Sequence, residues 1–208
     1  MDETRNDLLL RGTAAAEPAF SHENHGQRFY RFPLSVRRLS GQADVLQVIA
    51  TGEQLSHLLP LTGRRLEIQG QLRSFNNKSG QGSRLVISAF TRLLVETAGE
   101  DVNIIELKGA ICKPPVLRRT PLGRCICDMM LAVNRRYGRA DYLPCIVWGS
   151  LAQRCASLGV GDGVRLEGRL QSRQYIKVEN GQNLTRTAFE VSVMKLEPAG
   201  AAIVPEQA

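Results

Sequence analysis

The segment Asn6-Asp-Leu-Leu-Leu-Arg-Gly12 returns 97 residues later as Asn103-Ile-Ile-Glu-Leu-Lys-Gly109. The correspondence continues along the chain: Gly41-x-Ala43-Asp44 matches Gly138-x-Ala140-Asp141 at the same offset, and Gly70-x-Leu72-x-Ser74 matches Gly168-x-Leu170-x-Ser172 at an offset of 98. A repeat of about a hundred residues is long enough to be a whole domain with its own core. The sequence therefore predicts two copies of one small domain.

The apolar pattern of the second copy predicts strands and one short helix. Arg124–Asn134 and Asp141–Trp148 alternate apolar and polar residues, which is typical of half-buried strands. Residues 149–158 have helical spacing, and a glycine-rich turn follows them. An alternating strand then begins near Val164, and a last strand is expected over Thr185–Glu197.

A short helix between the third and fourth of five strands is the order of an OB-fold, a Greek-key barrel that commonly binds oligonucleotides. We therefore predict an all-β chain of two tandem OB-folds over residues 1–98 and 101–197, with a short flexible tail over 198–208. Turn signals at Lys78–Gly82 and Glu179–Gln182 predict hairpins, which serve either as plain turns or as flaps over a ligand.

Charge points to the second copy as the binding half. The net charge is +7, which favours a polyanionic partner, although solvated surface charge explains many basic proteins equally well. Residues 101–208 hold 15 basic and 10 acidic residues, or +5, whereas residues 1–100 hold 12 and 10, or +2. With no apolar run long enough to span a bilayer and no signal-peptide pattern, a soluble, cytoplasmic protein without membrane contact is expected.

The sequence offers no catalytic set. His22-x-x-His25 lacks a second ligand pair and is better explained as a solvated loop than as a metal site. The five cysteines are an odd number, all in the second copy, and Cys125-x-Cys127 lies in an apolar stretch, so reduced core thiols are expected. Gly159-x-Gly161-x-Gly163 lacks the Lys-Ser/Thr of a phosphate loop. We therefore expect neither an enzyme nor a cofactor nor a metal site.

Residues 103–196 carry five motifs in order: Asn103-x-Ile105-x-Leu107-x-Gly109, Arg119-Thr-Pro121-x-Gly123, Leu131-Ala-Val-Asn-Arg-Arg-Tyr137, Tyr142-x-Pro-Cys-Ile-Val-Trp148-Gly-x-x-Ala152 and Val160-Gly-Asp-Gly-Val-x-Leu-x-Gly168-Arg. Together they resemble the bacterial single-stranded DNA-binding protein family. Residues 6–97 match only its framework of glycines and apolar positions. Primosomal OB proteins share that framework, so a replication-restart adaptor that mainly binds protein partners is the alternative.

The resemblance implies that bases stack on four aromatic residues: Tyr137, Tyr142, Trp148 and Tyr175. The residue pattern agrees, because Tyr142 and Trp148, with Ile146, are expected to face away from the core, and Tyr175 shares the outward face of its strand with arginines. Packing of a subunit interface is the competing explanation. Phosphate contacts are expected from six cations: Arg135, Arg136, Arg139, Arg169, Arg173 and Lys177. The expected role is sequence-tolerant binding of single-stranded DNA in replication, recombination or repair, in association with the nucleoid. RNA binding would use the same chemistry.

The first copy lacks this aromatic set. The matching positions hold Ser40, Val45, Thr51 and, near the last one, Asn77. Phe29 and Phe75 are possible outward-facing substitutes, but assembly or auxiliary binding is the expected role of this copy. The tandem form implies a homodimer with four OB-folds. Family members often recruit replication and repair proteins through an acidic C-terminal tip, whereas Pro198–Ala208 has one acidic residue, so such partners are expected to use another surface.

Overall fold

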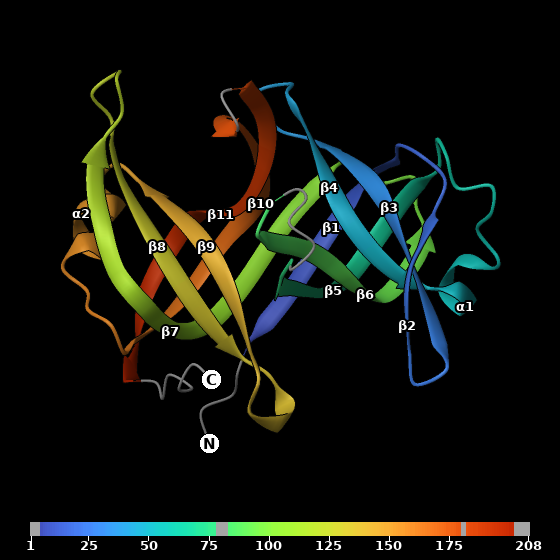
Figure 1. Cartoon of the computed structure of the whole chain (residues 1–208), viewed down its shortest axis with the longest axis horizontal. Helices are drawn as coiled ribbons and strands as arrows, with labels where there is room; N and C mark the ends of the chain where they lie inside the picture. Colours follow the sequence, from blue (N-terminus) through green and yellow to red (C-terminus); the bar gives the residue numbers. More distant parts are fainter. Residues whose placement is uncertain (1–4, 78–82, 180–181, 202–208) are drawn as a thin grey trace. The chain divides into compact units, whose positions relative to one another are not determined.

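The computed structural model describes residues 5–77, 83–179 and 182–201, and it confirms two tandem OB-folds (Figure 1). The first copy contains β1 (Asn6–Ala14), β2 (Ala19–Asn24), β3 (Gln27–Arg37), β4 (Ala43–Thr51), α1 (Gly52–Leu55), β5 (Arg65–Asn76) and β6 (Leu85–Glu96). The second copy contains β7 (Val102–Arg119), β8 (Cys125–Asn134), the 3₁₀ turn η1 (Arg136–Gly138), β9 (Ala140–Trp148), α2 (Ser150–Ala156), β10 (Asp162–Glu179) and β11 (Gln182–Ala201). In the second copy α2 lies between the third and fourth strands, β9 and β10, as predicted. In the first copy, where β1 and β2 together correspond to β7, α1 lies between β4 and β5.

The second copy closes into a barrel. β7, β8 and β9 are antiparallel neighbours, β9 pairs in parallel with β11, and β10 pairs with both β11 and β7. The strands β7 to β11 curve round a common axis (Figure 1). The first copy follows the same circuit through β1, β3, β4, β6 and β5. Closure leaves one shared interior for apolar side chains and places alternate residues outside.

Compact packing divides the described residues into two units. The first-repeat unit holds residues 7–73 and 87–104, and the second-repeat unit holds residues 5–6, 74–77, 83–86, 105–179 and 182–201. The outer ends of β5 and β6 therefore cluster with the barrel of the second copy, although the repeat assigns them to the first.

Two repeated glycines explain why the repeat is visible in the sequence. A Cβ atom on Gly12 would lie less than 3.0 Å from the carbonyl oxygen of Ser35, and one on Gly109 would meet the carbonyl oxygen of Ala132 equally closely. Real Cβ atoms essentially never come so near backbone atoms. Each glycine therefore marks a place where the first strand of a barrel presses against its neighbour, and both copies keep that requirement.

The second barrel confirms the predicted alternation. Cys127, Met129, Leu131 and Val133 on β8 are buried, and so are Leu143, Cys145 and Val147 on β9. β10 and β11 stay paired as far as Glu179 and Gln182, which makes a long two-stranded arm beyond the barrel. β11 continues to Ala201, opposite Asp162. Residues 202–208 of the expected tail, like residues 78–82 and 180–181 of the expected hairpin turns, lie outside the described residues.

Candidate nucleic-acid interface

The four aromatic residues lie outside the barrel core. Tyr142 and Trp148 lie on the outward face of β9, whereas Leu143, Cys145 and Val147 on its inward face are buried. Tyr175 is on the β10–β11 arm opposite Arg186, and Tyr137 is in the β8–β9 turn. Tyr137 is 95% exposed and Trp148 38% exposed, while Tyr142 and Tyr175 are half-buried.

Tyr137 is held in an unusual backbone conformation. Its φ is 63°, in the left-handed region, and Gly138 follows with φ 68°. A non-glycine residue in this region costs on the order of 1–3 kcal/mol, and such outliers cluster at functional sites. The turn is closed by the Arg135 amide, which donates to the carbonyl of Arg139 at 2.7 Å. The phenol ring is therefore presented at the tip of a fixed turn.

The strands bring Arg169 next to the face that carries Tyr142 and Trp148. Ile146 pairs with Ser192 of β11, and Ser192 pairs with Arg169 of β10, so the three form one row across the outer surface. Ile146 faces outward as expected but is buried, with Ser192. Alternation predicts which face a side chain takes but not what covers it, and long neighbouring side chains can lie over an outward residue. The outward surface of β9 near Tyr142 and Trp148 is therefore closely packed.

Two of the six expected phosphate-contacting cations already have anionic partners. The Arg135 guanidinium donates from Nε (2.5 Å) and Nη2 to the carboxylate of Asp141, which is fully buried. Arg173 lies 3.6 Å from a carboxylate oxygen of Glu190, and its guanidinium is 5.8 Å from the ring centroid of Tyr175. That distance is within the range of a cation–π contact, so Arg173 also orients the Tyr175 ring.

The other four cations differ in exposure. Arg136 and Arg139 are exposed on either side of Tyr137, and Arg169 is half-buried. Lys177 is on the β10–β11 arm, and its side chain lies outside the described part of the structure. Arg136 and Arg139 are thus exposed to an incoming polyanion beside Tyr137.

Ser74 is a residue of this site that sequence reasoning missed. Its amide donates to Asp141 Oδ1 at 2.6 Å, its carbonyl accepts from Arg135 Nη2 at 3.1 Å, and its hydroxyl accepts from the Tyr142 amide at 2.8 Å. The match to Ser172 marks Ser74 as a repeated position, but nothing in the sequence indicates partners more than 60 residues away. Ser74 therefore holds the outer end of β5 against the start of β9.

The phenylalanine at position 29 does not substitute for a missing aromatic residue in the first copy. Phe29 is buried, with its ring stacked on His22 at 4.8 Å between centroids and tilted against Phe90 at 5.5 Å. Phe29, a possible outward substitute, is instead covered by neighbouring rings. Phe75, in contrast, is 56% exposed.

Three of the five cysteines are core residues, and Cys112 and Cys125 are half-buried. Cys127, Cys145 and Cys155 are buried, and burial raises the pKa of the Cys155 thiol to about 12 and that of the Cys145 thiol further still. Such thiols stay protonated and unreactive at neutral pH. No group of three potential metal ligands occurs among the described residues. No helix within the described ranges is long and apolar enough to cross a membrane.

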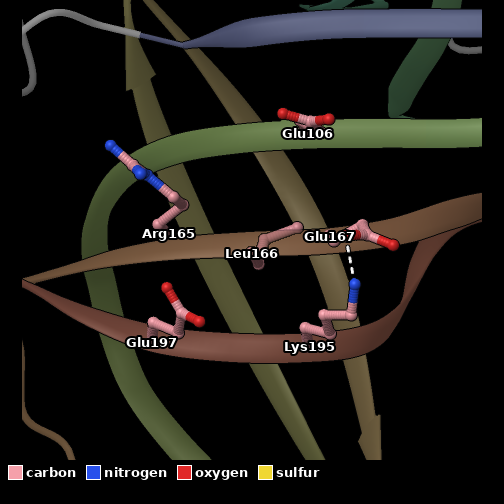
Figure 2. A pocket seen from close by; sticks show the side chains of 6 residues that line it. All are labelled: Glu106, Arg165, Leu166, Glu167, Lys195 and Glu197. Atoms are coloured by element: carbon pink, nitrogen blue, oxygen red, sulfur yellow. Dashed lines mark hydrogen bonds and ion pairs between the residues drawn. The ribbon is translucent and has the colours of Figure 1, made fainter.

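A separate pocket on β7, β10 and β11 has the wrong charge for a polyanion (Figure 2). Glu106, Glu167 and Glu197 surround it together with two cations, Arg165 and Lys195. Lys195 Nζ lies 2.8 Å from Glu167 Oε2, and this hydrogen bond raises the pKa of Lys195. Three carboxylates against two cations would repel a phosphate backbone, so this pocket is not part of the interface.

Comparison with known proteins follows the same division of the chain. Two closed barrels, each with one parallel strand pair (β4 with β6 and β9 with β11), define the chain as a tandem OB-fold protein. Residues 102–198, slightly less than half of the chain, match the model of the single-strand binding protein family.

The similar proteins are single-stranded DNA-binding proteins. The single-stranded DNA-binding protein of Halalkalibacterium halodurans is 33% identical over 106 residues, covering 48% of this chain and 63% of the relative. Single-stranded DNA-binding protein A of Bacillus subtilis is 35% identical over 105 residues, covering 47% and 60%. The chain thus matches less than two thirds of the length of these relatives. The solved single-stranded DNA-binding protein of Thermus aquaticus shares the fold over 99% of this chain and 97% of its own, with a TM-score of 0.74 and 24% identity.

Proposed function

We propose that this protein binds single-stranded DNA without catalysis and with little sequence preference, through the outward face of the second barrel. The observation that carries the proposal is that Tyr137, Tyr142, Trp148 and Tyr175, all in the family-matched segment, lie outside the barrel core. Bases stack on such rings with about 1–3 kcal/mol each, and every base offers a flat π-face. The family match favours this role over that of a replication-restart adaptor.

The arginines of the proposed interface have different roles. Arg136 and Arg139 contact phosphates directly beside Tyr137, because both are exposed. Arg169 shares a cross-strand row with Ile146, which lies between Tyr142 and Trp148 on β9, and it contacts the phosphates there. Arg173 holds the Tyr175 ring in place. Arg135 has a structural task, the neutralisation of Asp141. The second half of the chain carries the larger basic excess, which supports the same placement.

We assign residues 1–98 to a barrel for assembly or auxiliary binding and residues 101–197 to the strand-binding barrel. Residues 198–201, expected to belong to the tail, instead continue β11 alongside β10. Two chains would then assemble into a homodimer with four OB-folds. The setting is the cytoplasm, on DNA exposed during replication, recombination or repair.

The decisive experiment uses the single tryptophan of the chain, Trp148. Long oligo-dT is titrated into the protein at two salt concentrations while Trp148 fluorescence is followed. Strong quenching is expected, with an affinity that falls in a log–log plot by a slope of about −0.7 per phosphate neutralised. Tight binding without quenching would remove Trp148 from the site, and absence of binding would return the adaptor role to first place.

A further inference from the structure

The outer hairpin of the first copy is built into the second-repeat unit. Ser74 makes three hydrogen bonds to residues of β9 and the turn before it, as described above. At the other side of the same hairpin, Ser83 Oγ donates to the carbonyl of Thr187 on β11 at 3.0 Å. Two separate contacts therefore fix this hairpin on the strands that flank the proposed interface.

The alternation of β5 then places Phe75 on the open side of the hairpin. Leu72 and Ser74 are buried, whereas Phe75 is 56% exposed. Phe75 is the neighbour of Ser74, whose hydroxyl accepts from the Tyr142 amide at 2.8 Å, so its Cα lies within roughly 10 Å of the Tyr142 backbone. A single exposed phenylalanine is ordinary on a protein surface, but Phe75 is exposed directly after a serine that is hydrogen-bonded to the backbone of a proposed base-stacking tyrosine.

We propose that Phe75 is a fifth base-stacking residue of the interface, supplied by the first copy to the site of the second. This inference rests on the proposed function. A strand that stacks on Tyr142 continues onto Phe75, where the ring offers the next base an apolar π-face. The first copy, which lacks aromatic residues at the four matching positions, contributes to binding through its hairpin instead.

The first test removes the ring. In the full chain, Phe75→Ala is expected to weaken binding of long oligo-dT by roughly 5- to 150-fold, the range of a lost stacking contact. The slope of log affinity against log salt stays the same, because no charge is removed. Phe20→Ala is the matched control: Phe20 is 57% exposed, lies in the first-repeat unit and is expected to leave affinity unchanged. An affinity for Phe75→Ala equal to that of the wild type would overturn the inference.

The second test reports contact directly. In a Phe75→Trp, Trp148→Phe double variant the only tryptophan is at position 75, and oligo-dT is expected to quench its fluorescence. Unchanged fluorescence at saturating oligo-dT would overturn the assignment of Phe75. The wild-type Trp148 titration separates the two ideas: quenching there without an effect at position 75 refutes only the role of Phe75, whereas absence of DNA binding by the wild type refutes the proposed function.

Discussion

The buried carboxylate of Asp141 should be one of the most sensitive positions in the second barrel. Asp141 accepts hydrogen bonds from Arg135 Nε, Arg135 Nη2 and the Ser74 amide, and its side chain is fully buried. In Asp141→Asn one carbonyl oxygen must serve these three donors, and the amide NH₂ opposes at least one of them. An unsatisfied buried donor costs about 1–3 kcal/mol, and breaking a buried ion pair about 3–5 kcal/mol.

Partial solvation reduces that cost. The Arg135 side chain is 24% exposed, so water can reach part of the guanidinium after the charge of Asp141 is lost. We therefore expect Asp141→Asn to lower the free energy of unfolding by about 2–4 kcal/mol. Urea unfolding followed by circular dichroism measures it, through a lower midpoint at an unchanged m-value.

Asp128→Asn is the matched control, because Asp128 pairs with Arg118 while both side chains are more than 40% exposed. Exposed pairs contribute about 0.2–1 kcal/mol, so this variant should unfold nearly as the wild type does. Equal losses in the two variants, or a loss below about 1 kcal/mol for Asp141→Asn, would show that the Asp141 network does not stabilise the barrel.

Three further outcomes are expected. Gly109→Ala should destabilise the fold by about 1–3 kcal/mol because its Cβ would strike the backbone of Ala132, whereas Gly159→Ala, with no atom within 3.4 Å of its added Cβ, should cost far less; thermal unfolding compares the two. Tyr137→Gly should raise stability by about 1 kcal/mol by relieving the left-handed residue while it weakens oligo-dT binding; a variant that binds as tightly as the wild type would contradict stacking there. Replacing Arg136 and Arg139 together by Gln should reduce the salt slope by about 1.4, and an unchanged slope would remove both from the phosphate path.

The sequence predicted the barrels because their requirements are local and repeat. A glycine such as Gly109 is fixed by the nearness of one neighbouring strand, and the alternation along β8 follows from a single buried face. Both signals can be recognised within about ten residues. The fold class, the helix position and the outward faces of β9 and β10 followed from them.

The burial and the hydrogen-bond partners of the site residues could not be predicted, because they depend on residues far apart in the sequence. Arg135 has the same residue type as Arg136, and only the structure shows that Asp141 engages it. Ile146 was expected to be exposed on the outward face and Phe29 was a possible outward residue, but both are buried, Phe29 beside the rings of His22 and Phe90. The partners of Ser74 lie 61 to 68 positions along the chain, beyond any periodic signal.

Because Ser74 and β9 belong to the same chain, the contact between them does not depend on protein concentration. A barrel of this kind on a chain with one copy would have to obtain such a serine from another molecule, and the fraction of complete sites would then follow protein concentration. Here the covalent connection converts that encounter into a unimolecular step with a high effective concentration. In the duplicated chain this contact therefore forms within a single molecule.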